Sequence, residues 1–154
     1  MTVGHEKVDI AYCGLCCNDC FNHKGEIADL ARDLRKKLRE EKFDQVAPGL
    51  SKYFEELGDY EKCYSTLGAM VRLRCGKMCH EGGGNPGCKI RKCCVKKGIQ
   101  GCWECSEAEA CDKHDFLKPI HGEENVDNLR KIKKVGLDKF SDMVSAKHLK
   151  GREQ

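Results

Sequence analysis

The chain has 154 residues, 13 of them cysteines, and a formal net charge of +3. Charged residues make up 34% of it, whereas Leu, Ile, Val and Phe together make up only about a fifth, which leaves little apolar surface for a core. This length favours a single domain over residues 1–154, and the small net charge argues against a strong nucleic-acid binder.

The abundance of cysteine needs a chemical explanation. The N-terminal stretch MTVGHEKVDIAY has no apolar region typical of a signal peptide, and no apolar run is long enough to span a bilayer. We therefore expect a cytoplasmic protein without a membrane partner, in a compartment that keeps thiols reduced. The odd number of cysteines also argues against a complete disulfide framework. Metal binding explains the thiols better than disulfides or unligated cysteines do, and metal bonds would add the cohesion that the small core lacks.

Segment 8–24 is predicted to form an N-terminal cysteine knuckle. Val8, Ile10 and Tyr12 alternate with polar or small residues, which predicts a short strand. Two pairs of cysteines follow, and two residues separate the members of each pair, so that one tight turn can aim both sulfurs at one point. The four cysteines are Cys13, Cys16, Cys17 and Cys20.

Segment 25–73 is predicted to be helical. Residues 26–41 show the period of an amphipathic helix. Its apolar stripe consists of Ile27, Leu30, Ala31, Leu34 and Leu38. Pro48 is expected to begin a second, short helix, and Asp59 is expected to cap a third. Cys63 lies on the predicted inner stripe of that third helix, so we expect it to be buried as a small hydrophobic residue and not to be a ligand.

Segment 74–113 is predicted to be the main metal-binding module. Its eight cysteines are Cys75, Cys79, Cys88, Cys93, Cys94, Cys102, Cys105 and Cys111. The glycine-rich stretch 82–87 is expected to form a loop that brings Cys88 back toward Cys75 and Cys79. Trp103, the single tryptophan, should shield the site from water. The lysines and arginines of 88–98 are expected to be counter-charges for thiolates, because nearby cations lower the pKa of cysteine.

Segment 114–150 is predicted to contain two helices. Apolar residues from Val126 to Ile132 mark the first, which Gly136 should end, and Leu137, Phe140 and Val144 mark the second. We expect both helices to pack on the helix at 26–41 and to cover the metal module, and we expect the polar end 150–154 to fray. The predicted fold is therefore mainly α, a small helical domain with irregular cysteine-rich metal-binding loops and at most a short strand or hairpin.

Several motifs resemble a known family. They are Ala11–Leu15 with Cys17 and Cys20, the run CKIRKC from Cys88 to Cys93 with Lys97-Gly98, the later Cys102, Cys105 and Cys111, and Asn128-Leu129-Arg130 with Ile132-Lys133 and Gly136. They resemble the cysteine-rich prokaryotic family called domain of unknown function 3795 over about residues 10 to 140. The resemblance implies a metal-binding protein, with zinc as the expected metal and no activity assigned. On this match Cys16, Cys63 and Cys94 are additional to the family pattern, so the resemblance leaves ten candidate ligands: Cys13, Cys17, Cys20, Cys75, Cys79, Cys88, Cys93, Cys102, Cys105 and Cys111.

The spacing leaves the division into sites open. Two tetrahedral zinc ions need eight ligands. Cys75, Cys79, Cys88 and Cys93 could close one site, while the N-terminal triple and the triple Cys102, Cys105 and Cys111 could share another. Alternatively, Cys16, Cys94, His80 or His114 could replace one of these ligands.

Three functions follow from these patterns. The first is a protein with two structural Zn²⁺ sites, which could serve interaction with a protein partner. The second is an iron–sulfur protein, because Cys13, Cys17 and Cys20 have the spacing of radical S-adenosylmethionine enzymes. Asp19 stands where those enzymes usually have an aromatic residue, and the chain is too short for their barrel, which leaves a four-iron four-sulfur cluster as the alternative cofactor.

The third, a zinc-finger-like nucleic-acid or protein interaction module, is disfavoured as a nucleic-acid binder because its basic residues are mixed with acidic ones and aromatics are only 6%.

An enzyme with a catalytic zinc is the least favoured hypothesis. A catalytic zinc needs an open coordination position and a base nearby. Glu81, Glu104 and Glu107 lie close to cysteines in the sequence, but so many thiolates favour closed sites.

Overall fold

The computed structural model describes residues 8–151 and divides into two compact units. Unit 1 comprises the described residues up to Cys20 together with those from Lys77 onward, and unit 2 comprises Phe21–Gly76. Eleven of the cysteines therefore belong to unit 1, and Cys63 and Cys75 belong to unit 2.

The predicted mainly α fold is confirmed. Unit 2 contains α1 (Phe21–Lys24), α2 (Glu26–Glu40), α3 (Phe43–Leu50) and α4 (Tyr60–Arg72). Unit 1 contains α5 (Lys89–Lys97), α6 (Lys118–His121), α7 (Glu124–Val135) and α8 (Leu137–Gly151). The strand predicted at 8–12 is reduced, among the described residues, to one antiparallel bridge between Ile10 and Cys16.

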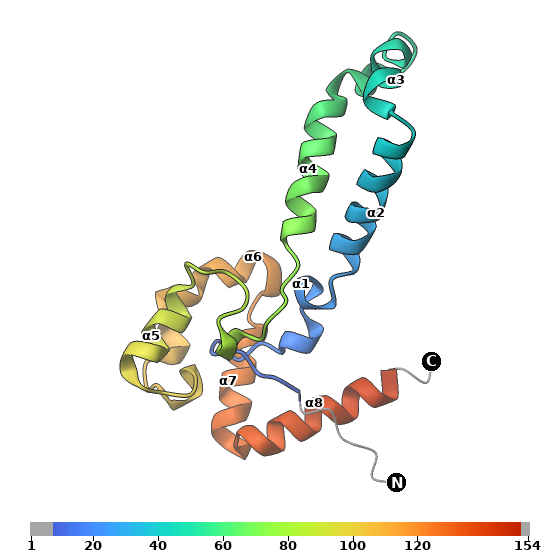
Figure 1. Ribbon diagram of the computed structural model, residues 1–154. Helices are drawn as coiled ribbons and strands as arrows, with labels where there is room; N and C mark the ends of the chain where they lie inside the picture. The colour runs from blue at the N-terminus through green and yellow to red at the C-terminus, as the bar shows by residue number, and fades with distance from the viewer. Residues whose placement is uncertain (1–7, 152–154) are drawn as a thin grey trace. The chain divides into compact units, whose positions relative to one another are not determined.

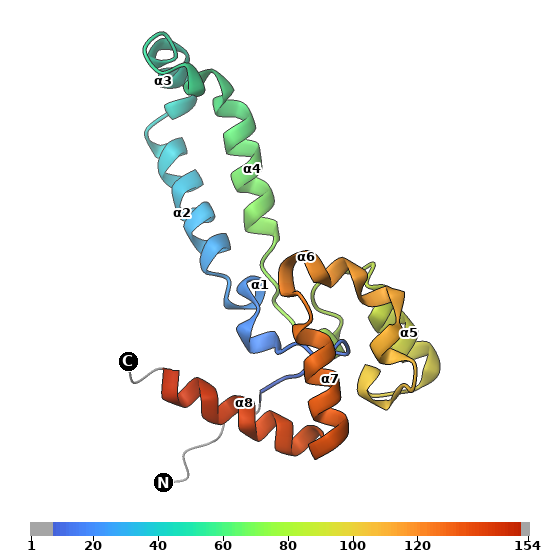
Figure 2. The same ribbon diagram turned by 180° about the vertical axis from the view of Figure 1, so that it is seen from behind.

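Unit 2 is a helical hairpin in which α2 and α4 lie side by side, with α3 at the connecting end (Figures 1 and 2). Small residues line the contact, because Ala28 and Ala31 of α2 and Gly68 of α4 are buried. The guanidinium of Arg35 lies 4.4 Å from the ring centroid of Tyr64, and a Cβ added at Gly68 would lie 3.1 Å from that guanidinium. The two helices therefore pack through small side chains and one arginine.

The stripe predicted for the 26–41 helix is only partly buried. The helix itself is confirmed, and Ala31 is buried, but Ile27, Leu30 and Leu34 are exposed, Leu30 by 71%. The physical reason is the close contact between α2 and α4, which small residues make and which leaves the larger apolar side chains outside it.

Three further expectations for unit 2 need correction. Helix α3 begins at Phe43 and ends at Leu50, and Pro48 lies inside it rather than at its start. Helix α4 does begin after Asp59, but the carboxylate of Asp59 does not cap it and pairs instead with Lys62 at 2.8 Å. The prediction that Cys63 is buried is wrong, because Cys63 is exposed. It lies about 140° around the helix from the buried Gly68, at roughly 100° per residue.

The core of unit 1 contains both ordinary apolar residues and cysteines. Its buried members are Val8, Ile10, Ile90, Cys94, Cys102, Trp103, Ala108, Leu117, Leu129, Ile132 and Phe140. Helix α7 lies against the short turns η4 (Cys102–Glu104) and η5 (Ala108–Ala110). The prediction that a C-terminal helix covers the cysteine-rich segment is thus confirmed for α7, which ends at Gly136 as expected. Packing of these helices on α2 involves both units and stays a prediction.

Hydrogen bonds from three elements hold the N-terminal segment in unit 1. The amide of Asn128 on α7 donates to the carbonyl of Gly14 at 3.0 Å, and the hydroxyl of Ser141 on α8 donates to the carbonyl of Val8 at 3.0 Å. The N–H of Cys102 donates to the carbonyl of Tyr12 at 2.8 Å. The N-terminal cysteines are therefore fixed next to the C-terminal ones.

Two predictions for the chain ends include residues outside the described range. The N-terminal stretch read for a signal peptide includes residues 1–7, and the polar end that was expected to fray includes residues 152–154. Within residues 8–151, no helix combines the length and the apolar character that a membrane span requires.

Candidate metal centre

A tight loop presents the first cysteines. The N–H of Ala11 donates to Leu15 O and the N–H of Gly14 donates to Ala11 O, both at 2.8 Å. Gly14 has a φ of +88°, and a Cβ there would lie 3.0 Å from Leu129 Cδ2. Glycine is needed at this position because the backbone takes a left-handed conformation directly against α7.

Cys13 lies near enough to Cys17, Cys79 and Cys88 for their charges to interact, and we call these four thiols the knuckle group. Burial raises the pKa of Cys13 to about 12, a hydrogen bond from the N–H of Leu15 lowers it, and the neighbouring thiols raise it again. Those neighbours are Cys79, Cys88 and Cys17. Four thiols from two distant segments therefore lie close enough to influence one another's charge.

Backbone hydrogen bonds link the two segments of the knuckle group. The N–H of Cys79 donates to the sulfur of Cys17, whose pKa burial raises to about 11. The N–H of Tyr12 in turn donates to the sulfur of Cys79, whose pKa burial also raises. Hydrogen bonds of this kind stabilise the thiolate form, so the backbone is already placed to support ligating sulfurs.

Arg91 supplies both structure and charge to the knuckle group. Its guanidinium donates to the carbonyls of Gly83 and, at 2.9 Å, Asn85, which fastens the glycine-rich loop. The same guanidinium lowers the pKa of Cys79. Arg91 therefore lies where the predicted counter-charge is needed, and Cys88 lies near enough to Cys79 for their charges to interact. The expected approach of Cys88 to Cys75 involves both units and stays a prediction.

A second set of thiols surrounds a cavity of about 50 Å³. Its lining includes the cavity group, which we define as Cys93, Cys94, Cys102, Cys105 and Cys111. The sulfurs of Cys94 and Cys102 are 3.6 Å apart. Two thiolates on one tetrahedral zinc, with bonds of about 2.3 Å, would be separated by about 3.8 Å. The spacing of these two sulfurs therefore suits a shared ion.

The thiols of the cavity group differ in their surroundings. Burial raises the pKa of Cys102, and the nearby thiols of Cys94 and Cys13 raise it further. The pKa of Cys105 is lowered, first by a hydrogen bond from the N–H of Glu107 and then by Lys97, whose Nζ lies 3.4 Å from the sulfur. Lys97 is therefore the second basic residue that acts as the predicted counter-charge.

The two candidate histidines differ. His114 is only 2% exposed and lines the cavity. Its Nδ1 contacts the side-chain amide of Asn125, while its Nε2 is buried without a hydrogen-bond partner, and burial lowers its pKa. His80 lies elsewhere, since its Nε2 donates to the carbonyl of Gln100 at 2.9 Å and its ring stacks on Tyr12. His114, and not His80, therefore lines the cavity that the cavity group surrounds. A buried imidazole with an unpartnered nitrogen suits a metal ligand.

The remaining predicted residues have varied positions. Trp103 is buried, 8% exposed, beside Cys102, and its ring lies so close to Gly101 that a Cβ there would overlap it at 2.2 Å. The knuckle and cavity groups leave out two predicted ligands. Cys20 follows the short turn η1 (Cys17–Asp19), and Cys75 belongs to unit 2.

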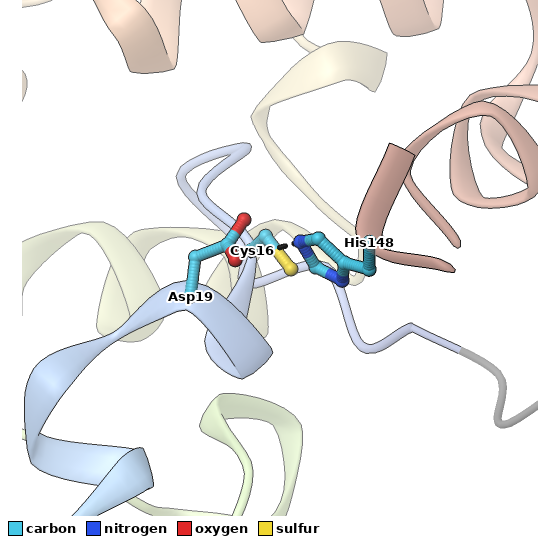
Figure 3. A group of neighbouring side chains, drawn as sticks. All are labelled: Cys16, Asp19 and His148. Carbon is cyan, nitrogen blue, oxygen red and sulfur yellow. Dashed lines mark ion pairs between the residues drawn. The ribbon is translucent and has the colours of Figure 1, made fainter. Parts of the chain in front are cut away.

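A separate cluster joins the two ends of unit 1. Figure 3 shows the side chains of Cys16, Asp19 and His148 converging, with an ion pair between His148 and Asp19. Within residues 8–151, this is the group of three metal-binding side chains whose ligand atoms all lie within 4.8 Å of one another. Sequence reasoning missed Asp19 and His148, because no spacing rule relates residues at opposite ends of a chain. Asn128, which holds the Gly14 turn, did carry a signal as part of a family motif.

These observations define a mainly α-helical, cysteine-rich protein whose many thiols and whose Cys–Asp–His cluster are consistent with metal binding. Residues 9–116 match the model of a family described as a protein of unknown function, DUF3795, and the chain belongs to this family. No curated protein and no solved structure matches it.

Proposed function

We propose that this protein binds two zinc ions through cysteine thiolates in unit 1, and that these ions stabilise its fold. The observation that carries the proposal is that thiols from separate segments lie in and around one core, close enough for their charges to interact. The core contains Cys94 and Cys102 among its buried members, so its packing and the chemistry of its sulfurs are coupled.

The residues present fit this role. Cys13, Cys17, Cys79 and Cys88 would hold one ion. The other would be held by Cys102, Cys105, Cys111 and a cysteine of α5, where Cys93 and Cys94 both line the cavity. The unpartnered Nε2 of His114 is a further donor beside that second site. This division differs from the one in which Cys75, Cys79, Cys88 and Cys93 share an ion.

Charge and spacing favour single zinc ions. Four thiolates and one Zn²⁺ leave a net charge of about −2, which Arg91 and Lys97 are placed to offset. The sulfurs of Cys94 and Cys102, 3.6 Å apart, suit two ligands of one ion. Within residues 8–151 no three cysteine sulfurs lie within 4.8 Å of one another, so the other thiols would close in when the metal binds. A four-iron cluster binds each cysteine to a different iron, which keeps the cysteine sulfurs further apart.

Elemental analysis of protein purified without oxygen tests the proposal directly. We expect about two zinc ions per chain and a colourless sample, since Zn²⁺ has a filled d shell. A brown sample with iron and sulfide, absorbing near about 400 nm, would establish an iron–sulfur protein instead. Protein without bound metal would refute both assignments.

Acidification is expected to release the metal steeply. The thiolate is the ligating form, and burial raises the pKa of Cys13 to about 12 and that of Cys17 to about 11, above the usual 9.0. At any lower pH protons therefore compete with the metal. Each thiol that must lose a proton lowers the affinity about tenfold per pH unit as the pH falls. A colorimetric zinc indicator, read from about pH 8 to about pH 5, measures this release. Zinc retention independent of pH would contradict thiolate ligation.

A further inference from the structure

The Cys16–Asp19–His148 cluster brings three different donor atoms to one place (Figure 3). The Nε2 of His148 lies 2.6 Å from a carboxylate oxygen of Asp19, and the sulfur of Cys16 lies within 4.8 Å of both ligand atoms. The side chains belong to unit 1, where Cys16 and Asp19 flank the turn η1 and His148 is on α8.

The backbone around the cluster is fixed by contacts that do not involve the three clustered side chains. The N–H of Asp19 donates to the carbonyl of Cys16 at 3.2 Å, which closes the turn, and Cys16 bridges to Ile10. At the other side, α8 is held by Phe140, which is buried in the core, and by Ser141, which donates to Val8 O. The donors therefore converge because the core holds their backbones, so little further ordering is needed when an ion binds.

An ion pair alone explains only part of this arrangement. Asp19 and His148 have side chains that are 50% and 29% exposed, and an ion pair this accessible contributes little to stability. The carboxylate of Asp19 also accepts a hydrogen bond from the thiol of Cys16, so all three side chains are already in contact. A thiolate, an imidazole and a carboxylate together are a donor set that zinc and related divalent metals accept.

We propose that Cys16, Asp19 and His148 form a third metal site, for a divalent transition metal such as Zn²⁺, with three protein ligands and one open position. This site goes beyond the proposed structural ions, since it uses no residue of the knuckle or cavity group. Zinc sites with three protein ligands keep their fourth position for water or a small ligand. The partly exposed donors make this ion exchangeable, and its binding ties the last helix to the N-terminal turn.

Cobalt binding to full-length protein that has been dialysed until it carries only its two structural zinc ions per chain, so that the exchangeable position is free, tests the third site. Co²⁺ reports its ligands through visible d–d bands and a sulfur-to-metal charge-transfer band. The test variants are Cys16→Ser, Asp19→Asn and His148→Gln. The matched control is His121→Gln, because His121 is also 29% exposed and also faces an acidic residue, Glu124, at 3.8 Å.

We expect the wild-type protein to bind one further Co²⁺ with a charge-transfer band for a single thiolate. Each test variant should lose that band and bind the ion at least about tenfold more weakly, whereas His121→Gln should behave like the wild type. Zinc content should be unchanged in all four variants, which separates this site from the thiolate sites. Equal cobalt binding by the test variants and the wild type, or no cobalt beyond the zinc, would overturn the proposal.

Discussion

Removal of metal by a chelator is expected to unfold the core of unit 1 and to shift the fluorescence of Trp103 to longer wavelength. Zinc contributes on the order of 10–16 kcal/mol to small domains that depend on it, which equals or exceeds the whole stability of a typical domain, about 5–15 kcal/mol. Trp103 is the single tryptophan of the chain and is buried between Cys102 and Cys105. Its emission therefore reports on unit 1 alone.

The control for this experiment is to add zinc back to the metal-free protein. Zinc added back under reducing conditions should restore the original emission maximum and the original melting curve, because the thiols are regenerated as ligands. Metal-free protein with the same emission and the same melting curve as the loaded protein would show that the ions do not hold the fold together.

Replacement of Cys102 by serine is expected to remove about one metal ion per chain and to lower the free energy of unfolding by more than about 3 kcal/mol, since loss of a metal belongs to the largest mutational effects. Cys102 is buried, lies 3.6 Å from Cys94 and belongs to the core cluster. Metal analysis and urea unfolding measure the two effects. The matched control is Cys63→Ser, because Cys63 is exposed on α4 and a surface change of this kind stays within about 0.5 kcal/mol.

Cysteine-to-serine substitutions at other positions test which cysteines hold each of the two ions. Cys20→Ser should keep both ions, because this thiol belongs to neither of the two groups. Of Cys93→Ser and Cys94→Ser, one should lose an ion and the other should keep it, since both line the cavity and one ligand is needed from α5. Loss of an ion from Cys20→Ser would contradict the proposed division.

Local patterns predicted the helices well where the pattern and the packing agree. The helices at 26–41 and 124–135 were predicted from apolar periodicity, and the second ends at the expected Gly136. The same reasoning failed where packing chose another face. Leu30 is exposed, because α2 approaches α4 through alanine and glycine, and Cys63 is exposed for the related reason that α4 buries its Gly68 side.

The sequence predicted only part of the candidate site. The paired cysteines and the basic residues near them identified the module, and Arg91 and Lys97 do act on its thiols. The choice between His80 and His114 was not open to prediction, because it depends on which ring is buried in the cavity. His148 carried no signal at all, since its neighbours Cys16 and Asp19 lie at the far end of the chain.

By itself the sequence determined that this is a mainly helical, cysteine-rich chain with a core too small for its length, because composition and short-range periodicity depend only on neighbouring residues. The tertiary structure decided which thiols lie together, placing Cys13 and Cys17 with Cys79 and Cys88 and grouping Cys102 with Cys94. Ligand spacing within a turn is a local property. The meeting of distant turns is set by how α7 and α8 pack on the N-terminal loop, and no local pattern encodes it.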